Sequence, residues 1–184
     1  MQKTHQPRIV VLISGKGSNL QSIIDAVQMR VVDGEIVAVI SNNPDAPGLQ
    51  KAEKVGIPTH VVNHREFPDR ESFDTSLAEV VEQYQPNLVL LCGFMRILTP
   101  EFVAKFEGRM MNIHPSLLPK YPGLHTHQRA LDAGDTVAGA TVHFVTSELD
   151  GGPAIIHAEV PVMEDDTAET LAERVFEQEH LIYP

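Results

Sequence analysis

The stretch RIVVLISGKGSNLQSIIDAV, from Arg8 to Val27, carries the pattern that decides the fold. Its first residues, Arg8 to Ser14, form an apolar run rich in β-branched side chains, which is typical of a strand covered on both faces. The glycine-rich segment GKGSN follows, and from about Asn19 the apolar residues recur along one stripe of a helix. A buried strand, a glycine turn and an amphipathic helix in this order predict the first unit of a parallel α/β sheet.

The rest of the chain repeats this alternation. Further strands are predicted at residues 35–41, 57–62, 87–93 and 109–114, and helices at 50–54, 68–83, after Pro100 and at 127–133. Residues 139–146 and 154–162 alternate more openly around the turn LDGGP, which predicts an antiparallel pair. Asp166, with Glu169 three residues on, resembles a capping box at the start of the last helix. We therefore expect an α/β fold, with an open, mostly parallel Rossmann-like sheet flanked by helices and a C-terminal antiparallel strand pair.

Composition limits the class of protein. The 184 residues suit a single domain, and 42% hydrophobic with 21% charged residues is ordinary for a globular protein. The formal net charge of −11 argues against a general nucleic-acid or anionic-membrane binder. The single cysteine, Cys92, excludes an internal disulfide and fits a reducing compartment. The N-terminal MQKTHQPR lacks an apolar signal region, and no apolar run reaches the roughly 18 residues of a membrane span, so we expect a cytoplasmic protein.

The first candidate site is SGKGSN, residues Ser14 to Asn19. Sites in parallel sheets lie beyond the carboxyl ends of the strands, and free amides at a helix start can hold a phosphate. The segment is neither a P-loop nor a G-x-G-x-x-G fingerprint, because Leu20 occupies the last position. A plain strand-to-helix turn is the alternative interpretation.

The second candidate site is the end of the strand RMMNIH. Asn112 and His114 face the same way, because residues two apart in a strand share a face. An amide is a neutral hydrogen-bond donor, and an imidazole exchanges a proton near neutral pH. The pair therefore suits a carbonyl oxygen that gains negative charge. The alternative is an edge histidine beside a turn asparagine.

Asp150, in the segment ELDGGP, is open to two interpretations. It can reach His114, orient it and favour its protonated form. It can equally form a hairpin turn with the two glycines that follow and have no functional role.

The remaining candidates are weaker. Phe94, Met95 and Ile97 follow a buried strand and either wall an apolar ligand pocket or pack in the core. The apolar neighbours of Cys92 argue against a nucleophile. The chain also contains a set of histidines that invites a metal hypothesis: His114, His125, His127 and His143. No CxxC or HExxH motif accompanies them, so we expect no metal.

Several segments together resemble the phosphoribosylglycinamide formyltransferase family, the folate-dependent enzymes of purine synthesis. They are VVLISGKGSNLQSII, FMRIL, NIHPSLLPKYPGLHTHQRAL and TVHFVTSELDGGP. The match runs in order from Arg8 to Pro184. It implies the formyltransferase fold and the transfer of a formyl group from the co-substrate 10-formyltetrahydrofolate to the amine of glycinamide ribonucleotide, without a metal. The N-terminal half would bind the ribonucleotide phosphate, and the C-terminal half would bind folate and carry the catalytic residues.

The resemblance also implies individual site residues. The catalytic set falls on Asn112, His114 and Asp150. The ribonucleotide would be held by Gly17, Ser18 and Asn19 at its phosphate and by Glu179 at its ribose. The residues implied in folate binding are Arg70, Met95, Arg96, Ile97, Leu98, Asn112, Thr146, Ser147, Glu148, Leu149 and Asp150. Members of the family normally continue beyond Tyr183-Pro184, so the resemblance does not define the edge of the ribonucleotide site.

Other functions remain as alternatives. A formyltetrahydrofolate deformylase uses similar residues but lets water attack; such enzymes usually carry an extra N-terminal domain, for which a first strand at about Arg8 leaves no room. A methionyl-tRNA formyltransferase would need a further C-terminal domain and a basic surface. A non-enzymatic nucleotide-binding module would explain SGKGSN but not Asn112, His114 and Asp150 together. We expect small-molecule substrates as the only partners, with no nucleic acid or membrane, and a monomer or weak homodimer.

Overall fold

The structure of the protein, a computed structural model, describes residues 6–184. Within this range, seven strands form one sheet in the order β3-β2-β1-β4-β5-β6-β7. The strands are β1 (Arg8–Ile13), β2 (Glu35–Ser41), β3 (Thr59–Val61), β4 (Leu88–Cys92), β5 (Met110–His114), β6 (Val137–Phe144) and β7 (Ala154–Pro161). Strands β1 to β5 run parallel, and β6 is antiparallel to both of its neighbours. The predicted sheet with its terminal antiparallel pair is thereby confirmed.

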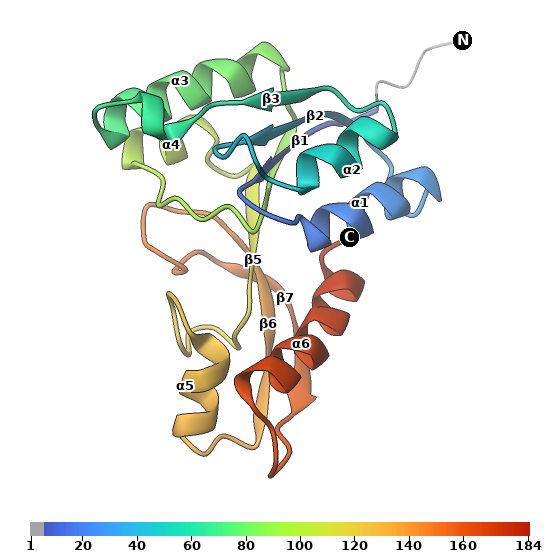
Figure 1. Cartoon of the computed structure of the whole chain (residues 1–184), viewed down its shortest axis with the longest axis vertical. Coiled ribbons are helices and arrows are strands. Elements are labelled where there is room, and N and C mark those ends of the chain that lie inside the picture. Colours follow the sequence, from blue (N-terminus) through green and yellow to red (C-terminus); the bar gives the residue numbers. More distant parts are fainter. Residues whose placement is uncertain (1–5) are drawn as a thin grey trace.

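Helices cover both faces of the sheet (Figure 1). They are α1 (Ser18–Gln28), α2 (Gly48–Lys54), α3 (Arg70–Gln83), α4 (Pro100–Lys105), α5 (Thr126–Asp132) and α6 (Ala168–Ile182), with a short 3₁₀ helix η1 (His64–Glu66). Helices α1 to α4 surround the β1–β4 part of the sheet, whereas α5 and α6 lie beside the extended β6–β7 hairpin. No helix of the described chain is long and apolar enough to cross a membrane.

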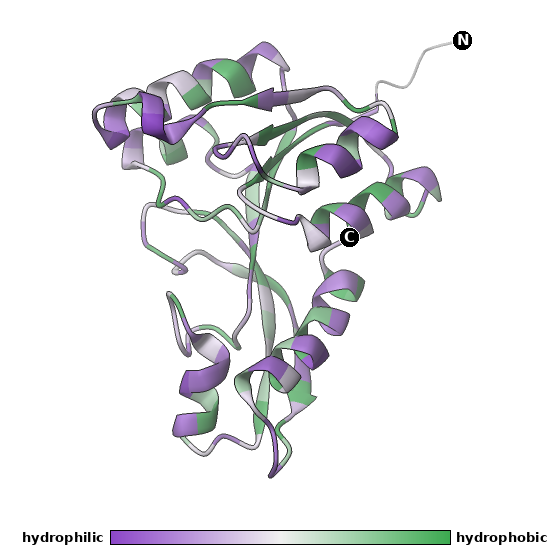
Figure 2. Ribbon diagram, in the orientation of Figure 1, coloured by the Kyte–Doolittle hydropathy of each residue, from purple (hydrophilic) through white to green (hydrophobic). Residues whose placement is uncertain are grey.

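The two faces of β1 supply two separate hydrophobic cores. Ile9, Val11 and Ile13 pack in one buried cluster with side chains of α1 and α6. Val10 and Leu12 pack in a second cluster with side chains of α3 and α4. This alternation explains the continuous apolar run in the sequence, because a strand buried on both faces needs apolar residues at every position. In Figure 2 the central strands β1 and β2 are mostly green, whereas the helices around them carry both green and purple stretches.

The helix starts differ in detail from the prediction. Helix α3 begins at Arg70 rather than at residue 68, because the Asp69 side chain accepts a hydrogen bond from the Ser72 amide (2.7 Å) and acts as the N-cap. The predicted capping box of Asp166 and Glu169 is wrong: Thr167 is the N-cap of α6 and exchanges hydrogen bonds with Thr170.

Strand β5 extends beyond the parallel part of the sheet. Its pairing with β4 ends at Leu91↔Asn112, whereas its pairing with β6 continues to His114↔Thr141. The last two residues of β5 therefore have a strand neighbour on one side only. His114 therefore lies past the carboxyl end of β4, where the loop 93–99 begins.

Candidate active site

His114 is buried, with 6% of its surface exposed, and both of its ring nitrogens face protein groups. Its Nε2 lies 2.8 Å from the backbone oxygen of Tyr121. A carbonyl oxygen can only accept, so Nε2 carries the proton and donates it. In the neutral ring Nδ1 is therefore unprotonated, and it lies 3.5 Å from Asp150 Oδ1. His114 thus presents a basic nitrogen next to a carboxylate.

Asp150 reaches His114 from the loop between β6 and β7, as the functional interpretation of ELDGGP predicted. Its backbone is left-handed, with φ of 52°. Its Oδ2 accepts a hydrogen bond from the Gly123 amide (2.8 Å), and its side chain is only 8% exposed. The turn geometry and the contact with His114 coexist, because the turn is what directs the carboxylate towards the sheet.

A second histidine, His143 on β6, also faces Asp150. Its Nδ1 donates to the Phe144 carbonyl (3.0 Å), so its unprotonated Nε2 points towards Asp150 Oδ1 at 3.9 Å. This Nε2 is buried and has no hydrogen-bond partner within residues 6–184. Burial lowers the pKa of His143, and this favours a neutral ring at physiological pH. In the sequence His143 stands out only as a metal-ligand candidate, and no sequence pattern indicates that the loop after β6 folds back to bring Asp150 to it.

Asn112 completes this cluster. It is half-buried and lies directly opposite His143 in the β5–β6 register, so the two side chains share a face of the sheet. Its side-chain amide makes no hydrogen bond to any described residue. The site therefore combines an available amide donor, a basic imidazole nitrogen and a carboxylate, which together can stabilise an oxyanion and move a proton.

The glycine-rich segment forms the start of α1. Gly17 is the N-cap residue, with left-handed dihedral angles (φ 62°, ψ 48°), and no side chain caps the helix. The first turn of α1 contains no acidic residue. The amides of Ser18, Asn19 and Leu20 lie in this turn, where backbone donors have no partner inside the helix. Such a terminus favours an anion through its free donors and through the helix dipole.

Glu179 on α6 lies next to this helix start. Its Oε1 accepts a hydrogen bond from Asn19 Nδ2 (3.2 Å), and the residue is 3% exposed. Burial raises the pKa of Glu179 from its ordinary value of 4.5 to about 7, although the hydrogen bond from Asn19 acts in the opposite direction. Asn19 Oδ1 and Glu179 Oε2 are buried without a hydrogen-bond partner in the described chain. Unpaired buried polar atoms are rare in folded proteins, so these two are notable beside the start of α1.

The loops implied in folate binding are partly exposed. Met95 and Ile97 after β4 are 66% and 58% exposed, and Leu149 beside Asp150 is 54% exposed. Arg70 Nη2 donates to the Ile97 carbonyl (2.6 Å), which joins the start of α3 to the loop after β4. The core-packing interpretation is therefore wrong for Met95 and Ile97, but it holds for Phe94, which packs against the second core cluster. Cys92 is buried, and desolvation raises the pKa of its thiol well above its ordinary value, so no reactive thiolate is present there.

Four histidines suggested a metal in the sequence. Across residues 6–184 the structure contains no group of three or more His, Cys, Asp or Glu side chains that could hold a metal ion. His125 is the N-cap residue of α5, with φ of 57°.

The sheet thus carries a free helix start after β1 and, at the end of β5, an amide, an imidazole and a carboxylate, a combination suited to acyl transfer. Residues 7–184 match the family described as formyl transferase, and the chain belongs to this family.

Among named relatives, the chain is similar to phosphoribosylglycinamide formyltransferase of Escherichia coli (strain K12), with 54% identity over 176 residues that cover 96% of this chain and 83% of the relative. It is 52% identical to the trifunctional purine biosynthetic protein adenosine-3 of Bos taurus, covering 96% of this chain but only 18% of that protein. The solved structure of phosphoribosylglycinamide formyltransferase from Coxiella burnetii superposes with a TM-score of 0.93 at 53% identity, covering 98% of this chain and 84% of that one.

Proposed function

We propose that this protein transfers the formyl group of 10-formyltetrahydrofolate to the amine of glycinamide ribonucleotide, giving formylglycinamide ribonucleotide and tetrahydrofolate in de novo purine biosynthesis. The observation that carries the proposal is the convergence of His114 Nδ1 and Asp150 Oδ1 at 3.5 Å, beside the available amide of Asn112. It occurs in a chain that is 54% identical to a phosphoribosylglycinamide formyltransferase over most of its length.

The proposed chemistry is acyl transfer through a tetrahedral intermediate. The amine nitrogen forms a bond to the formyl carbon, and the carbonyl oxygen becomes an oxyanion. Asn112 donates a hydrogen bond to this oxyanion, and the imidazolium form of His114 stabilises its charge. The proton lost by the amine is accepted by His114 Nδ1. The departing folate nitrogen gains a proton as its bond to the formyl carbon breaks. The two substrates held side by side supply much of the rate by proximity.

Asp150 has two roles in this proposal. Its carboxylate pairs with the imidazolium that forms when His114 Nδ1 accepts a proton, and it takes part in moving the proton between the two substrate nitrogens, with water as a bridge. His143 stays neutral because of its burial, and its unprotonated Nε2 accepts a hydrogen bond from the same water. In this proposal His114, Asp150 and His143 are three acceptors that share one transferable proton.

The substrate contacts follow the same proposal. The amides of Gly17 to Asn19 bind the ribonucleotide phosphate, and the Glu179 carboxyl, one oxygen of which has no partner among residues 6–184, accepts a ribose hydroxyl. Folate contacts Arg70, Arg96, the exposed loop Met95 to Leu98, and the loop Thr146 to Asp150. We treat residues 1–184 as one formyltransferase domain. The predicted cytoplasmic location and monomer or weak homodimer remain predictions, and light scattering across a concentration series tests the second.

Incubation with 10-formyltetrahydrofolate, with and without glycinamide ribonucleotide, tests the activity. We expect folate product to form only when the ribonucleotide is present, and the His114→Ala variant to form none under the same conditions, which excludes a contaminating enzyme. Equal turnover with water alone would instead identify a deformylase.

Calorimetry tests the anion site separately. Ribonucleotide and inorganic phosphate are each titrated into the protein, and we expect them to compete for one site at residues 17–19. A crystal soaked with the ribonucleotide that leaves this loop empty would disprove the assignment.

A further inference from the structure

The segment Tyr121–Gly123 contacts both members of the His114–Asp150 pair. The Tyr121 carbonyl accepts the proton of His114 Nε2 at 2.8 Å, and the Gly123 amide donates to Asp150 Oδ2 at 2.8 Å. One short segment of the loop between β5 and α5 therefore fixes the tautomer of the histidine and the position of the carboxylate.

The direction of the Tyr121 carbonyl depends on an unusual backbone conformation. Tyr121 has φ of 53°, in the left-handed region that non-glycine residues seldom adopt. Such a conformation costs about 1–2 kcal/mol and persists only where the surroundings enforce it. We therefore expect the contacts of the Tyr121 side chain to hold its backbone in this conformation.

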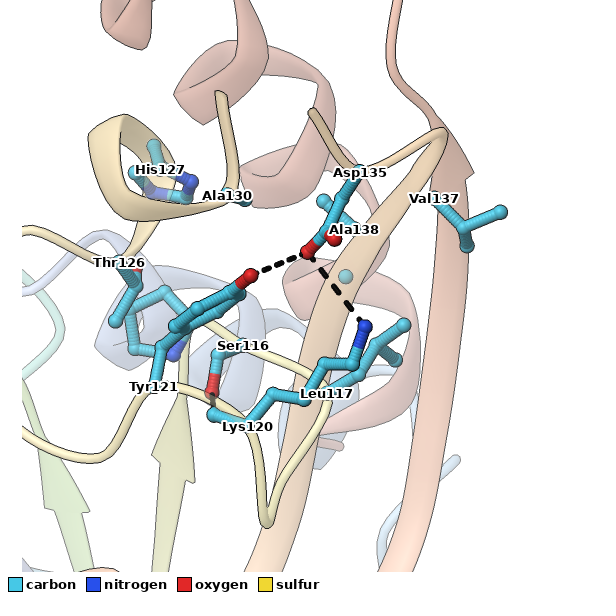
Figure 3. A pocket seen from close by; sticks show the side chains of 12 residues that line it. Ser116, Leu117, Lys120, Tyr121, Thr126, His127, Ala130, Asp135, Val137 and Ala138 are labelled. Carbon is cyan, nitrogen blue, oxygen red and sulfur yellow. Dashed lines mark hydrogen bonds and ion pairs between the residues drawn. The ribbon is translucent and has the colours of Figure 1, made fainter. Parts of the chain in front are cut away.

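Two contacts hold the Tyr121 side chain. Its hydroxyl donates to Asp135 Oδ2 at 2.6 Å (Figure 3), and its ring lies under the guanidinium of Arg129, 5.2 Å from the ring centroid. Arg129 also donates to the carbonyl of Pro122 (2.6 Å), the residue that follows Tyr121. Asp135 forms an ion pair with Lys120 (3.6 Å), the residue that precedes Tyr121.

Asp135 is itself fixed between α5 and β6. Its amide donates to the Ala130 carbonyl (3.1 Å), and β6 begins two residues later at Val137. The hydrogen bond to this carboxylate is the main cause that raises the pKa of the Tyr121 hydroxyl above its ordinary value, so the hydroxyl remains a donor over the neutral range. The contact therefore anchors the loop to the sheet.

We propose that Tyr121 and Asp135 are positioning residues, whose hydrogen bond holds the Tyr121 carbonyl against His114 Nε2 and keeps His114 in the tautomer that directs a basic Nδ1 at Asp150. The inference rests on the proposed function, in which this Nδ1 accepts the substrate proton. Neither residue touches the reacting atoms; they act through the backbone of the loop. A purely structural role would stabilise the loop but would leave the tautomer of His114 and the turnover per folded molecule unchanged.

The Tyr121→Phe variant removes only the hydroxyl. Nitrogen-15 NMR of the imidazole rings reports which nitrogen of each histidine carries the proton, and a His114→Ala sample assigns the His114 signals. We expect the wild type to show His114 protonated at Nε2 in its neutral form, and Tyr121→Phe to show a mixture of tautomers. We expect kcat to fall by about 10-fold or more, since a displacement of about 1 Å can cost about 10²-fold, with the KM for the ribonucleotide unchanged.

Tyr84→Phe is the matched control, because it removes a phenolic hydroxyl that bonds to no described residue. A series at Asp135 supplies the second test: Asp135→Asn keeps an acceptor for the tyrosine and loses the ion pair with Lys120, whereas Asp135→Ala loses both. We expect Asp135→Asn to retain most of kcat, Asp135→Ala to match Tyr121→Phe, and the double variant Tyr121→Phe/Asp135→Ala to be no slower than either single one.

The possible outcomes separate this inference from the proposed function. An unchanged His114 tautomer and kcat in Tyr121→Phe, with only a lower melting temperature, would overturn the positioning role. Additive losses in the double variant would overturn it as well. A tautomer shift in a protein whose wild type transfers no formyl group would retain the positioning role and remove the proposed function, because the NMR measurement needs no turnover.

Discussion

Asp150 occupies a turn conformation that asparagine also tolerates, and this makes it a clean site for substitution. Asp150→Asn keeps the shape of the side chain and an oxygen for the Gly123 amide but removes the charge and the proton acceptor. We expect kcat to fall by about 10²–10⁴-fold, the usual size of a general acid–base contribution, with the melting temperature close to that of the wild type. Stopped assays and thermal melts of the same preparations give both quantities.

Asp33→Asn, at an exposed position far along the chain, controls for the loss of one negative charge. Near-normal kcat combined with a lower melting temperature in Asp150→Asn would make Asp150 a turn residue only. Asn112 and His114 would then act without it.

Glu179 links pH to stability through its buried carboxyl. In the folded protein its pKa is about 7, above the ordinary value of 4.5, so between these values the folded state holds a proton that the unfolded state releases. The stability contributed by this group is therefore complete below about pH 4.5 and is lost as the pH rises through about 7. We expect the isosteric Glu179→Gln variant, which cannot ionise, to gain stability relative to the wild type as the pH rises from about 5 to about 8.

Denaturant unfolding of both proteins across this range measures the difference. Subtracting the unfolding free energy of the variant from that of the wild type isolates the effect of Glu179 from that of the other titrating groups, provided that both proteins keep the hydrogen bond from Asn19. A difference that does not depend on pH would mean that the carboxyl is ionised in the folded protein at every pH tested.

At the scale of the element, the close approach of β6 to β7 depends on a glycine, Gly139. An added Cβ at Gly139 would collide with the Ala158 carbonyl of β7 and would lie 2.8 Å from Leu117 Cδ2. We expect Gly139→Ala to force β6 and β7 apart and to destabilise the protein by about 1–3 kcal/mol, the usual cost of overpacking. Gly15→Ala is the control, because nothing lies within 4 Å of its added methyl group. Equal melting temperatures for the two variants would contradict this prediction.

The elements also show where sequence reasoning holds and where it ends. The buried run of β1 is predictable because an apolar residue at every position of a short β-branched segment is typical of a strand covered on both faces. Asn112 and His114 are predictable because residues two apart share a face. The predicted start of α6 is wrong by one residue, since Asp166 and Thr167 are both good caps and the choice depends on Arg174, which binds Asp166 at 2.8 Å.

The contacts of His143 and Tyr121 cannot be predicted from the sequence, for a different reason. His143 reaches Asp150 only because the loop after β6 folds back over the sheet, and Tyr121 acts through its backbone carbonyl, which every residue has. A side-chain pattern carries no information about which carbonyl a loop will direct at a ring. The pairing of His114 with Asp150 follows from family resemblance, because their linear separation gives no independent evidence of a contact.

At the scale of the whole molecule, the net charge of −11 opposes the approach of anionic substrates. We expect kcat/KM for the ribonucleotide to rise as NaCl increases from about 10 mM to about 150 mM, because the Debye length falls from about 30 Å to about 8 Å and screens the repulsion. The value of kcat at saturation should change little. A decrease in kcat/KM would show that the local field of the helix start and nearby lysines dominates the encounter.

The hydrogen bond between Tyr121 and Asp135 also makes the molecule convenient to observe. The chain has no tryptophan and only three tyrosines, so the tyrosine region of its near-ultraviolet spectrum comes from Tyr84, Tyr121 and Tyr183 alone. Near-ultraviolet circular dichroism depends on fixed tertiary surroundings, and Tyr121 is held in place by a carboxylate and a guanidinium. If the loop between β5 and α5 changes when a substrate binds, the circular dichroism of Tyr121 will change with it. Subtracting the spectrum of the Tyr121→Phe protein from that of the wild type isolates the contribution of Tyr121. The movement of the loop can thus be followed by light alone, in solution, without a label.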